Sequence, residues 1–410
     1  MRALVFKFSY PRFALARVMG FFSPRGFTTP GGPFGYGDIP EPTLPADDWV
    51  VVRTKLCGIC GSDSKQVFLH GAFDNPITSL ITFPQVLGHE AVGIVDRVGP
   101  GVKHRKVGER VVLNPWLSCT PRGIAPVCDA CERGMLWACA NFNHGDLPPG
   151  IHIGTCTGAP GGYAPRFAAH ESQLFAIPDG VSDEQAVLAD PFAVSFHAVL
   201  KVPPADNSMA LVYGAGTLGL LTVKILRALY PTVRVVVIAR YHHQRQRALD
   251  FGAHEVLASQ DPTRIIERIG SMVHAEVHRP WFGRPWILRG VDVVYDTIGS
   301  AESLEVGVRV ARPRASIVVT GVDTPARFEW TPLYFKEVAI VGSNAFGIED
   351  FEGERRHAMD IYLRLMASGR FDASGMITHR FRVDEYREAF VVANRKGPNE
   401  AVKAIFRYDE

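Results

Sequence analysis

Three groups of residues in this chain have the types and the spacing that metal-assisted redox chemistry requires. They are Cys60-Gly61-Ser62-Asp63 with Gly88-His89-Glu90, the cysteines Cys119, Cys128, Cys131 and Cys139, and the loop Gly214-Ala215-Gly216-Thr217-Leu218-Gly219. Thiolates and imidazoles are ligands of zinc, and a glycine-rich turn between a strand and a helix accepts the phosphates of a dinucleotide. Zinc-assisted oxidation of an alcohol needs both a Lewis acid and a hydride acceptor, so the groups support one another. Together they predict an enzyme.

The first group has the donors of a catalytic zinc site. Such a site uses three protein ligands and leaves a fourth position open to an oxygen substrate. Cys60 and His89 are the first two predicted ligands, and Asp63 is expected to accept a hydrogen bond from the free imidazole N–H and fix its tautomer. The third ligand is either Glu90 or Asp190. A buried thiol and an unrelated core histidine would be the alternative explanation of the pair.

The second group predicts a closed metal site, because four thiolates complete a tetrahedral zinc and leave no position for a substrate. Its alternative is a set of free thiols in a loop. Cys57 and Cys156 match no ligand position and are expected to be ordinary core residues.

The third group predicts a dinucleotide site. The loop follows the predicted strand Met209–Tyr213 and opens the predicted helix Leu218–Leu229, the context in which this glycine pattern has meaning. Gly214 would make the turn, Gly216 would admit the pyrophosphate, and Gly219 would let the helix approach the strand, with Thr217 and Leu218 completing the loop.

The end of the next predicted strand bears on which nucleotide binds. That strand, Val233–Ala239, ends in Arg240 rather than in an acidic residue. A guanidinium suits a 2′-phosphate, so the sequence favours NADP over NAD. In the alternative, Arg240 stacks on adenine or faces solvent in an NAD enzyme.

The elements that must position these groups change character along the chain. Short β-rich runs separated by glycine and proline dominate to about residue 180, as in a barrel-like unit, whereas residues 20–48 are expected to be loop. From residue 209, apolar strands alternate with amphipathic helices, which predicts a parallel, doubly wound sheet. A helix interrupted by Pro191 is expected over 183–200, a long helix over 355–368, and an insertion over 278–289.

Composition narrows the class of protein. A chain of 410 residues is expected to form about two domains, and its 44 basic and 42 acidic residues give no overall electrostatic footprint for nucleic acid or an anionic membrane. Seven cysteines with C-x-x-C spacing suit thiolates in a reducing compartment, so we expect the cytoplasm. The first 37 residues are basic without an acid, as in a transit peptide, but Arg2–Phe6 is better explained as the first strand.

The motifs also carry a family resemblance. Gly88-His89-Glu90-Ala91-Val92-Gly93, followed by Gly99 and Val102, resembles the zinc signature of the medium-chain dehydrogenase/reductase superfamily, and 58–63 resembles its first-ligand motif. The resemblance implies zinc on Cys60, His89 and Asp190, with Glu90 beside the metal and Ser62 relaying the substrate proton. Asp190 stands where relatives have Cys or Glu, and Lys65 stands where many have a relay histidine.

The same resemblance implies the architecture. A GroES-like β-barrel catalytic domain would cover 1–191 and 344–410, with a structural-zinc lobe at about 116–142, and a Rossmann domain would cover 192–343. In this lobe, eight residues separate Cys119 from Cys128 where the family has two, so the intervening loop is expected to bulge outward.

The resulting expectation is hydride transfer between a small-molecule alcohol or carbonyl and a nicotinamide cofactor. Two zinc ions per chain and a homodimer or homotetramer would accompany it. The rivals are a zinc-free reductase of the same superfamily and a non-catalytic zinc- and nucleotide-binding redox sensor.

Overall fold

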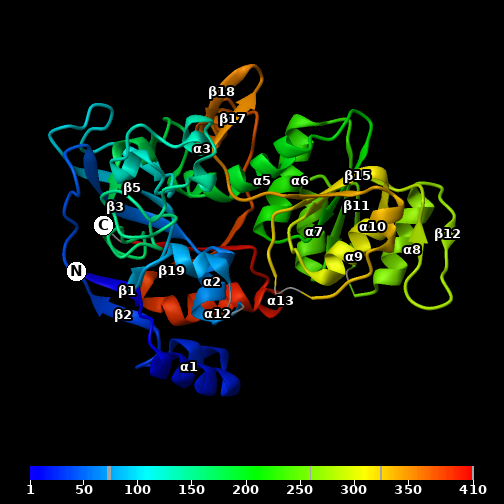
Figure 1. Cartoon of the computed structure of the whole chain (residues 1–410), viewed down its shortest axis with the longest axis horizontal. Coiled ribbons are helices and arrows are strands. Elements are labelled where there is room, and N and C mark those ends of the chain that lie inside the picture. The colour runs from blue at the N-terminus through cyan, green and yellow to red at the C-terminus, as the bar shows by residue number, and fades with distance from the viewer. Residues whose placement is uncertain (72–74, 259, 324–325, 409–410) are drawn as a thin grey trace. The chain divides into compact units, whose positions relative to one another are not determined.

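The computed structural model describes residues 1–71, 75–258, 260–323 and 326–408, and these form two compact units. Unit 1 comprises Met1–Asp190, Phe346–Ser368 and Ile377–Glu410. Unit 2 comprises Pro191–Ala345 and Gly369–Met376. Figure 1 shows the chain coloured from one end to the other, with the late segments returning to the first unit.

Unit 1 is built on two β-sheets. The larger sheet follows the order β19 (Ile377–Arg382), β20 (Lys403–Arg407), β3 (Trp49–Gly58), β5 (Glu90–Val98), β6 (Arg110–Leu113) and β8 (Leu174–Ala176), and β7 (Arg166–His170) also pairs with β3. The smaller sheet has the order β2 (Phe34–Asp38), β1 (Arg2–Phe6) and β4 (Gln85–Val86). The predicted first strand, Arg2–Phe6, is therefore confirmed.

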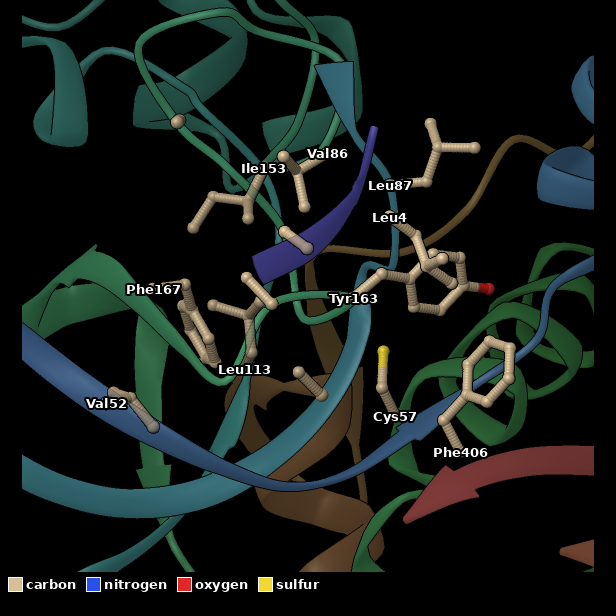
Figure 2. Packing of buried hydrophobic residues seen from close by; sticks show 14 of the residues in the cluster. Leu4, Val52, Cys57, Val86, Leu87, Leu113, Ile153, Tyr163, Phe167 and Phe406 are labelled. Atoms are coloured by element: carbon tan, nitrogen blue, oxygen red, sulfur yellow. The ribbon is translucent and has the colours of Figure 1, made fainter. Parts of the chain in front are cut away.

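Both sheets of unit 1 contribute to one hydrophobic core. Leu4 of β1, Val52 of β3 and Phe406 of β20 belong to the same buried cluster, and Figure 2 shows Leu4 and Phe406 near Tyr163 and Cys57, with Val52 on the Phe167 side of the cluster. The Tyr163 and Phe406 rings pack edge to face at 5.1 Å between centroids. Cys57 and Cys156 are fully buried, as expected of core residues.

Short helices and a hairpin complete unit 1. They are α1 (Tyr10–Phe22), α2 (Gly61–Val67), α3 (Asp129–Glu132), α4 (Asp183–Ala186), the hairpin β17 (Ile348–Phe351) and β18 (Glu354–His357), α11 (Ala358–Ala367), α12 (Tyr386–Asn394) and α13 (Lys396–Asn399). Among the described residues, no helix combines the length and the apolar character that crossing a bilayer requires.

Unit 2 is a parallel sheet with helices between its strands. The strand order is β11 (Glu255–Ala258), β10 (Arg234–Ala239), β9 (Met209–Tyr213), β14 (Val291–Asp296), β15 (Ala311–Val319) and β16 (Ala339–Gly342). The helices are α5 (Ala189–Lys201), which starts at the boundary, then α6 (Thr217–Leu229), α7 (His242–Asp250), α8 (Pro262–Met272), α9 (Ala301–Val310) and α10 (Thr331–Phe335). This 3-2-1-4-5-6 order is that of a doubly wound dinucleotide-binding sheet, so the predicted fold of this unit is confirmed.

The region expected to be loop, 20–48, contains regular structure. It holds the end of α1, a 3₁₀ turn at Pro24–Thr28 and strand β2, whose five residues pair with β1. We did not predict α1, because apolar residues occur on nearly every side of it and leave no helical period in the sequence.

Two predicted helices are also corrected. The segment 355–368 begins as strand β18, paired with β17, before His357 starts α11 by accepting a hydrogen bond from the N–H of Met359 at 3.2 Å. Pro191 does not interrupt α5, since it lies in the first turn, where a backbone N–H has no partner within the helix. The predicted insertion at 278–289 holds the tip of a hairpin, β12 (Val277–His278) with β13 (Trp286–Ile287).

Candidate functional site

Strand pairing brings the first group of predicted ligands together in unit 1. Strand β3 is antiparallel to β5, and Gly58 at the end of β3 lies opposite Glu90 at the start of β5. Cys60 follows β3 as the N-cap of α2, and His89 directly precedes β5, so the turn after one strand meets the beginning of the other. One donor atom from each of Cys60, His89 and Glu90 lies within 4.8 Å of the others. A thiolate, an imidazole and a carboxylate at this separation fit a zinc ion.

Asp63 orients this donor set. One oxygen of its buried carboxylate accepts the backbone N–H of Cys60 at 3.0 Å and the hydroxyl of Tyr163 at 2.8 Å. Its other oxygen faces His89 Nδ1 at 3.6 Å, which is an ion-pair separation and longer than the hydrogen bond expected from the sequence. Burial disfavours a charged imidazole, but Asp63, Cys60 and Asp190 together outweigh it and raise the pKa of His89 well above its ordinary value. With Nδ1 facing Asp63, Nε2 is the nitrogen of His89 that would be available to a metal ion.

Glu90 is held by a buried lysine that the sequence did not reveal. Lys403 of β20 forms an ion pair with Glu90 Oε2 and donates to the carbonyl of Ile59 at 3.2 Å, and both charged side chains are only 2% exposed. Burial opposes the charge on Lys403, yet Glu90 and Cys60 outweigh it and raise its pKa. Gly58 is required here, because a Cβ would collide with the Glu90 carboxylate.

Asp190 is the other candidate third ligand. It is buried near Cys60, His89 and Glu90 but is not part of the group whose donor atoms lie within 4.8 Å of one another. Burial raises the pKa of Asp190 to about 7, and the charges of His89 and Glu90 act on it. The structure therefore keeps both carboxylates in the neighbourhood of the site, with Glu90 grouped with Cys60 and His89.

A small polar cavity of about 40 Å³ opens beside His89. Its lining residues are Ser62, Asp63, Gln66, Leu87, Gly88, His89, His152, Gly154 and Thr155. The predicted relay residue Ser62 is thus at the cavity, whereas Lys65 is exposed on α2.

His152, which lines the cavity, is another residue that sequence reasoning missed. Its ring lies 4.7 Å from that of His89, and its Nδ1 lies 2.7 Å from the carbonyl of Ile153. Nδ1 must donate to that carbonyl, so Nε2 is an acceptor. Burial and the nearby His89 lower the pKa of His152 to about 3, which keeps the ring neutral. Trp116 packs against it at 6.1 Å and extends the contact to Phe142 and Phe346.

The four predicted cysteines form a second donor set, also in unit 1. Their sulfur atoms all lie within 4.8 Å of one another, with Cys119 3.6 Å from Cys139 and Cys128 4.0 Å from Cys139. Hydrogen bonds from the N–H of Cys128 to Cys119 Sγ at 3.3 Å and from the N–H of Asn141 to Cys139 Sγ at 3.3 Å favour thiolates. Four sulfurs with such donors fit a closed zinc site.

Arg122 holds the loop between Cys119 and Cys128 against the rest of the lobe through hydrogen bonds. Its side chain is fully buried, and its guanidinium donates five hydrogen bonds at 2.7–3.1 Å to the carbonyls of Leu117, His144, Leu147, Pro148 and Gly150. The expected outward bulge is confined to the exposed residues after Arg122, while Pro121 and Arg122 turn inward. Burial lowers the pKa of Arg122. The ordinary pKa of a guanidinium is so high that the group still stays charged.

In unit 2, the glycine-rich loop has the geometry expected of a phosphate-binding turn. Gly214 follows β9 with a φ of +100°, and Gly216 is the N-cap of α6. A Cβ at Gly219 would collide with the carbonyl oxygen of Gly214, so only glycine lets the helix come this close. Thr217 and Leu218 form the first turn of α6, whose N–H groups and dipole favour an anion.

Arg240 lies where the second strand ends. It is exposed directly after β10, with its guanidinium carbon 5.6 Å from the centre of the Tyr241 ring. The Arg245 side chain donates to the Arg240 carbonyl at 3.2 Å. Two cations are therefore gathered at the strand end beside the phosphate-binding turn.

Comparison with known proteins identifies the family of both parts of the chain. Residues 46–179 match the family model "Alcohol dehydrogenase GroES-like domain", and 217–359 match "Zinc-binding dehydrogenase". A sorbitol dehydrogenase of Arabidopsis thaliana is 28% identical over 361 residues, covering 87% of this chain and 88% of that protein.

Solved structures are similar over most of the chain. An alcohol dehydrogenase of Escherichia coli complexed with NADH has a TM-score of 0.71 and 25% identity, covering 92% of this chain and 95% of that one. A zinc-binding dehydrogenase of Sinorhizobium meliloti bound to NADP has a TM-score of 0.69 and 25% identity, with the same coverage.

A GroES-like barrel with zinc donors and a doubly wound nucleotide sheet define a zinc- and nicotinamide-dependent oxidoreductase. The chain belongs to the zinc-dependent medium-chain dehydrogenase/reductase superfamily. It is an NAD(P)-dependent alcohol dehydrogenase-type enzyme that transfers hydride between a CH–OH group, or its carbonyl product, and the cofactor.

Proposed function

We propose that this enzyme acts on a small polyol, oxidising one hydroxyl of a substrate that carries a second hydroxyl beside it. The observation that carries the proposal is the polar lining of the cavity next to His89, where Ser62, Gln66, His152 and Thr155 all present hydrogen-bonding groups. A pocket for a simple alkyl alcohol would be lined by apolar side chains instead. The similarity to a sorbitol dehydrogenase supports the same class.

In this proposal, Cys60 and His89 hold the catalytic zinc, and Glu90 or Asp190 supplies the third ligand. When bound, zinc acts as a Lewis acid toward the substrate oxygen. Ser62 relays the proton that the substrate hydroxyl loses: its oxygen accepts that proton while its own O–H proton passes to the solvent, to which Ser62 is exposed. His152 Nε2 accepts a hydrogen bond from the neighbouring hydroxyl and so holds the substrate in one orientation.

We assign a second, structural zinc to Cys119, Cys128, Cys131 and Cys139, so that the chain would carry two. The support is the mutual proximity of the four sulfurs and the backbone N–H groups that point at them.

NADP is the proposed cofactor. The exposed guanidinium of Arg240 at the end of β10 offers a bidentate partner for a 2′-phosphate, and Arg245 lies beside it. An NAD enzyme would be expected to have a carboxylate at this strand end.

The remaining assignments concern the assembly. We propose a catalytic domain of 1–191 and 344–410, a cofactor domain of 192–343, and a cytoplasmic homodimer or homotetramer. An oligomer is favoured by β16, an edge strand with Ile340 38% exposed, because an apolar sheet edge can pair with a second copy. The cysteine-rich zinc lobe is suited to a reducing compartment.

A substrate panel tests the proposal. Nucleotide reduction would be measured with polyols, primary and secondary alcohols, hydroxy acids and hydroxymethyl-glutathione, each with NADP and NAD. We expect the highest kcat/KM with a polyol and NADP, and we expect Arg240→Asp to raise the KM for NADP at least about tenfold while sparing NAD. Efficient turnover of simple alcohols alone would refute the polyol assignment, and unchanged NADP kinetics in the variant would refute the cofactor assignment.

A further inference from the structure

Helix α1 presents an apolar face to solvent. Eight of its 13 residues are both apolar or aromatic and exposed, namely Tyr10, Pro11, Ala14, Leu15, Val18, Met19, Phe21 and Phe22. At about 100° per residue, these positions fall within about half of the helix circumference. Phe21 is 86% exposed and Phe22 78%, which is unusual for two adjacent aromatic residues.

The opposite face of α1 is fastened to unit 1, so the apolar face cannot simply turn inward. Phe13 packs edge to face against Phe6 at 5.9 Å and Phe8 at 5.1 Å. Gly20 lies so close to the Phe27 ring that a Cβ would collide with it. In Figure 1, α1 stands at the margin of unit 1, beyond the strands β1 and β2.

Positive charge borders the apolar face. Arg12 and Arg17 occupy the helix positions on its two edges, and Lys7 precedes the helix. Residues 1–37 contain five basic residues and no acidic one. Arg12 donates to the carbonyl of Gly32 at 3.0 Å, and a carbonyl does not neutralise the guanidinium charge. Arg25, which follows the helix, forms an ion pair with Glu388. The net charge of +2 for the whole chain conceals this local excess.

We propose that α1 docks this enzyme on an anionic membrane surface, with its apolar face inserted between headgroups and its arginines at the phosphate level. An apolar stripe with aromatic residues, bordered by cations, is the pattern of a helix that lies in the membrane interface. The helix is about 20 Å long, so it lies on the bilayer and does not cross it. The cytoplasmic leaflet carries the anionic lipids that such cations attract.

A second copy of the chain fits this face less well. In a two-fold interface the same patch meets itself, so the cationic borders of one α1 would face those of the other. The helix has no acidic residue that could compensate them. A lipid surface presents negative charge to these borders, whereas a second α1 does not.

Vesicle co-sedimentation of the full-length protein tests the proposal. We expect binding to phosphatidylcholine vesicles that contain phosphatidylserine, weaker binding as salt rises, and little binding to phosphatidylcholine alone. The double variant F21S/F22S should bind about a hundredfold more weakly. The matched control is W281S/F282S, which removes two aromatic residues that are 97% and 93% exposed in the β12–β13 loop and should bind like the wild type.

Other outcomes would overturn the proposal. Failure of the wild type to sediment, equal losses in both double variants, or binding indifferent to anionic lipid would each do so. A lower molar mass of F21S/F22S by light scattering would identify α1 as a contact between copies instead. Nucleotide reduction by each variant verifies its fold, and Val18→Asp, which places one carboxylate in the apolar face, is the second variant if F21S/F22S misfolds.

Discussion

Replacing Arg122 with lysine tests whether one buried guanidinium keeps the cysteine lobe closed. Arg122 satisfies five backbone carbonyls, and each of these belongs to the chain around the lobe. Lysine keeps the charge but has three N–H donors, so at least two carbonyls would lose their partner. A buried acceptor left without a hydrogen bond costs about 1–3 kcal/mol. The variant should therefore favour opening of the lobe by about 3 kcal/mol, or roughly a hundredfold.

The assay is the rate at which a chromogenic chelator removes the proposed structural zinc from the lobe. We expect Arg122→Lys to release one equivalent roughly a hundredfold faster than the wild type. Arg133→Lys is the matched control, because Arg133 lies in the same lobe but its side chain is 66% exposed and forms a 2.9 Å ion pair with the exposed Asp129 carboxylate. Exposed pairs of this kind contribute about 0–1 kcal/mol. Release from Arg122→Lys at the wild-type rate would refute the reasoning.

Three further predictions follow from the same geometry. Asp63→Asn should weaken zinc binding at His89 by about 10–100-fold in a chelator competition, because a neutral amide cannot attract the imidazole as a carboxylate does. An unaltered zinc affinity would argue against the orienting role of Asp63. Burial lowers the pKa of His357 to about 3, so the folded state resists a proton that the unfolded state takes up below pH 6.5, and stability falls as pH falls through that range. His357→Asn, which can still cap α11, should lose about 2 kcal/mol less than the wild type between pH 7 and 5 in denaturation curves, and identical pH profiles would contradict the assignment. Cys131→Ser should contain one zinc fewer per chain by atomic absorption, and an unchanged metal content would remove the structural site.

The donor residues were predictable because residue type and spacing alone indicate metal binding. Cys60, His89 and the four cysteines are metal-ligand types whose spacing is typical of zinc sites. Gly214 is required because the turn has a positive φ there, and Gly219 because the helix backbone comes close to the carbonyl of Gly214. The alternation of strands and helices in unit 2 was equally visible, since buried parallel strands appear as continuous apolar runs.

Apart from Asp63, the residues that support the donors could not be predicted, because they come from distant parts of the chain. Lys403 lies 313 residues from Glu90, and Tyr163 lies 100 residues from Asp63. His152 forms an isolated β-bridge with Trp116, and Arg122 ends a 3₁₀ turn; neither residue has a motif around it. Only the pairing of β20 with β3 and the folding of the lobe bring these side chains to their partners.

Local signals failed where the tertiary structure overrode them. The helical period of 355–368 continues through residues that pair as β18, and eight apolar or aromatic residues of α1 are exposed to solvent while Phe13 and Ala16 face the core. In the first case strand pairing outweighs propensity, and in the second the sequence has no contrast between faces.

The central claim is that Cys60 belongs to the metal site at which the alcohol reacts. The most direct test is Cys60→Ala, with zinc content, NADPH binding by fluorescence and nucleotide reduction measured on the same preparation. We predict one zinc fewer per chain than in the wild type, cofactor binding within about twofold, and turnover lowered by at least about a thousandfold. Turnover close to that of the wild type would contradict the claim.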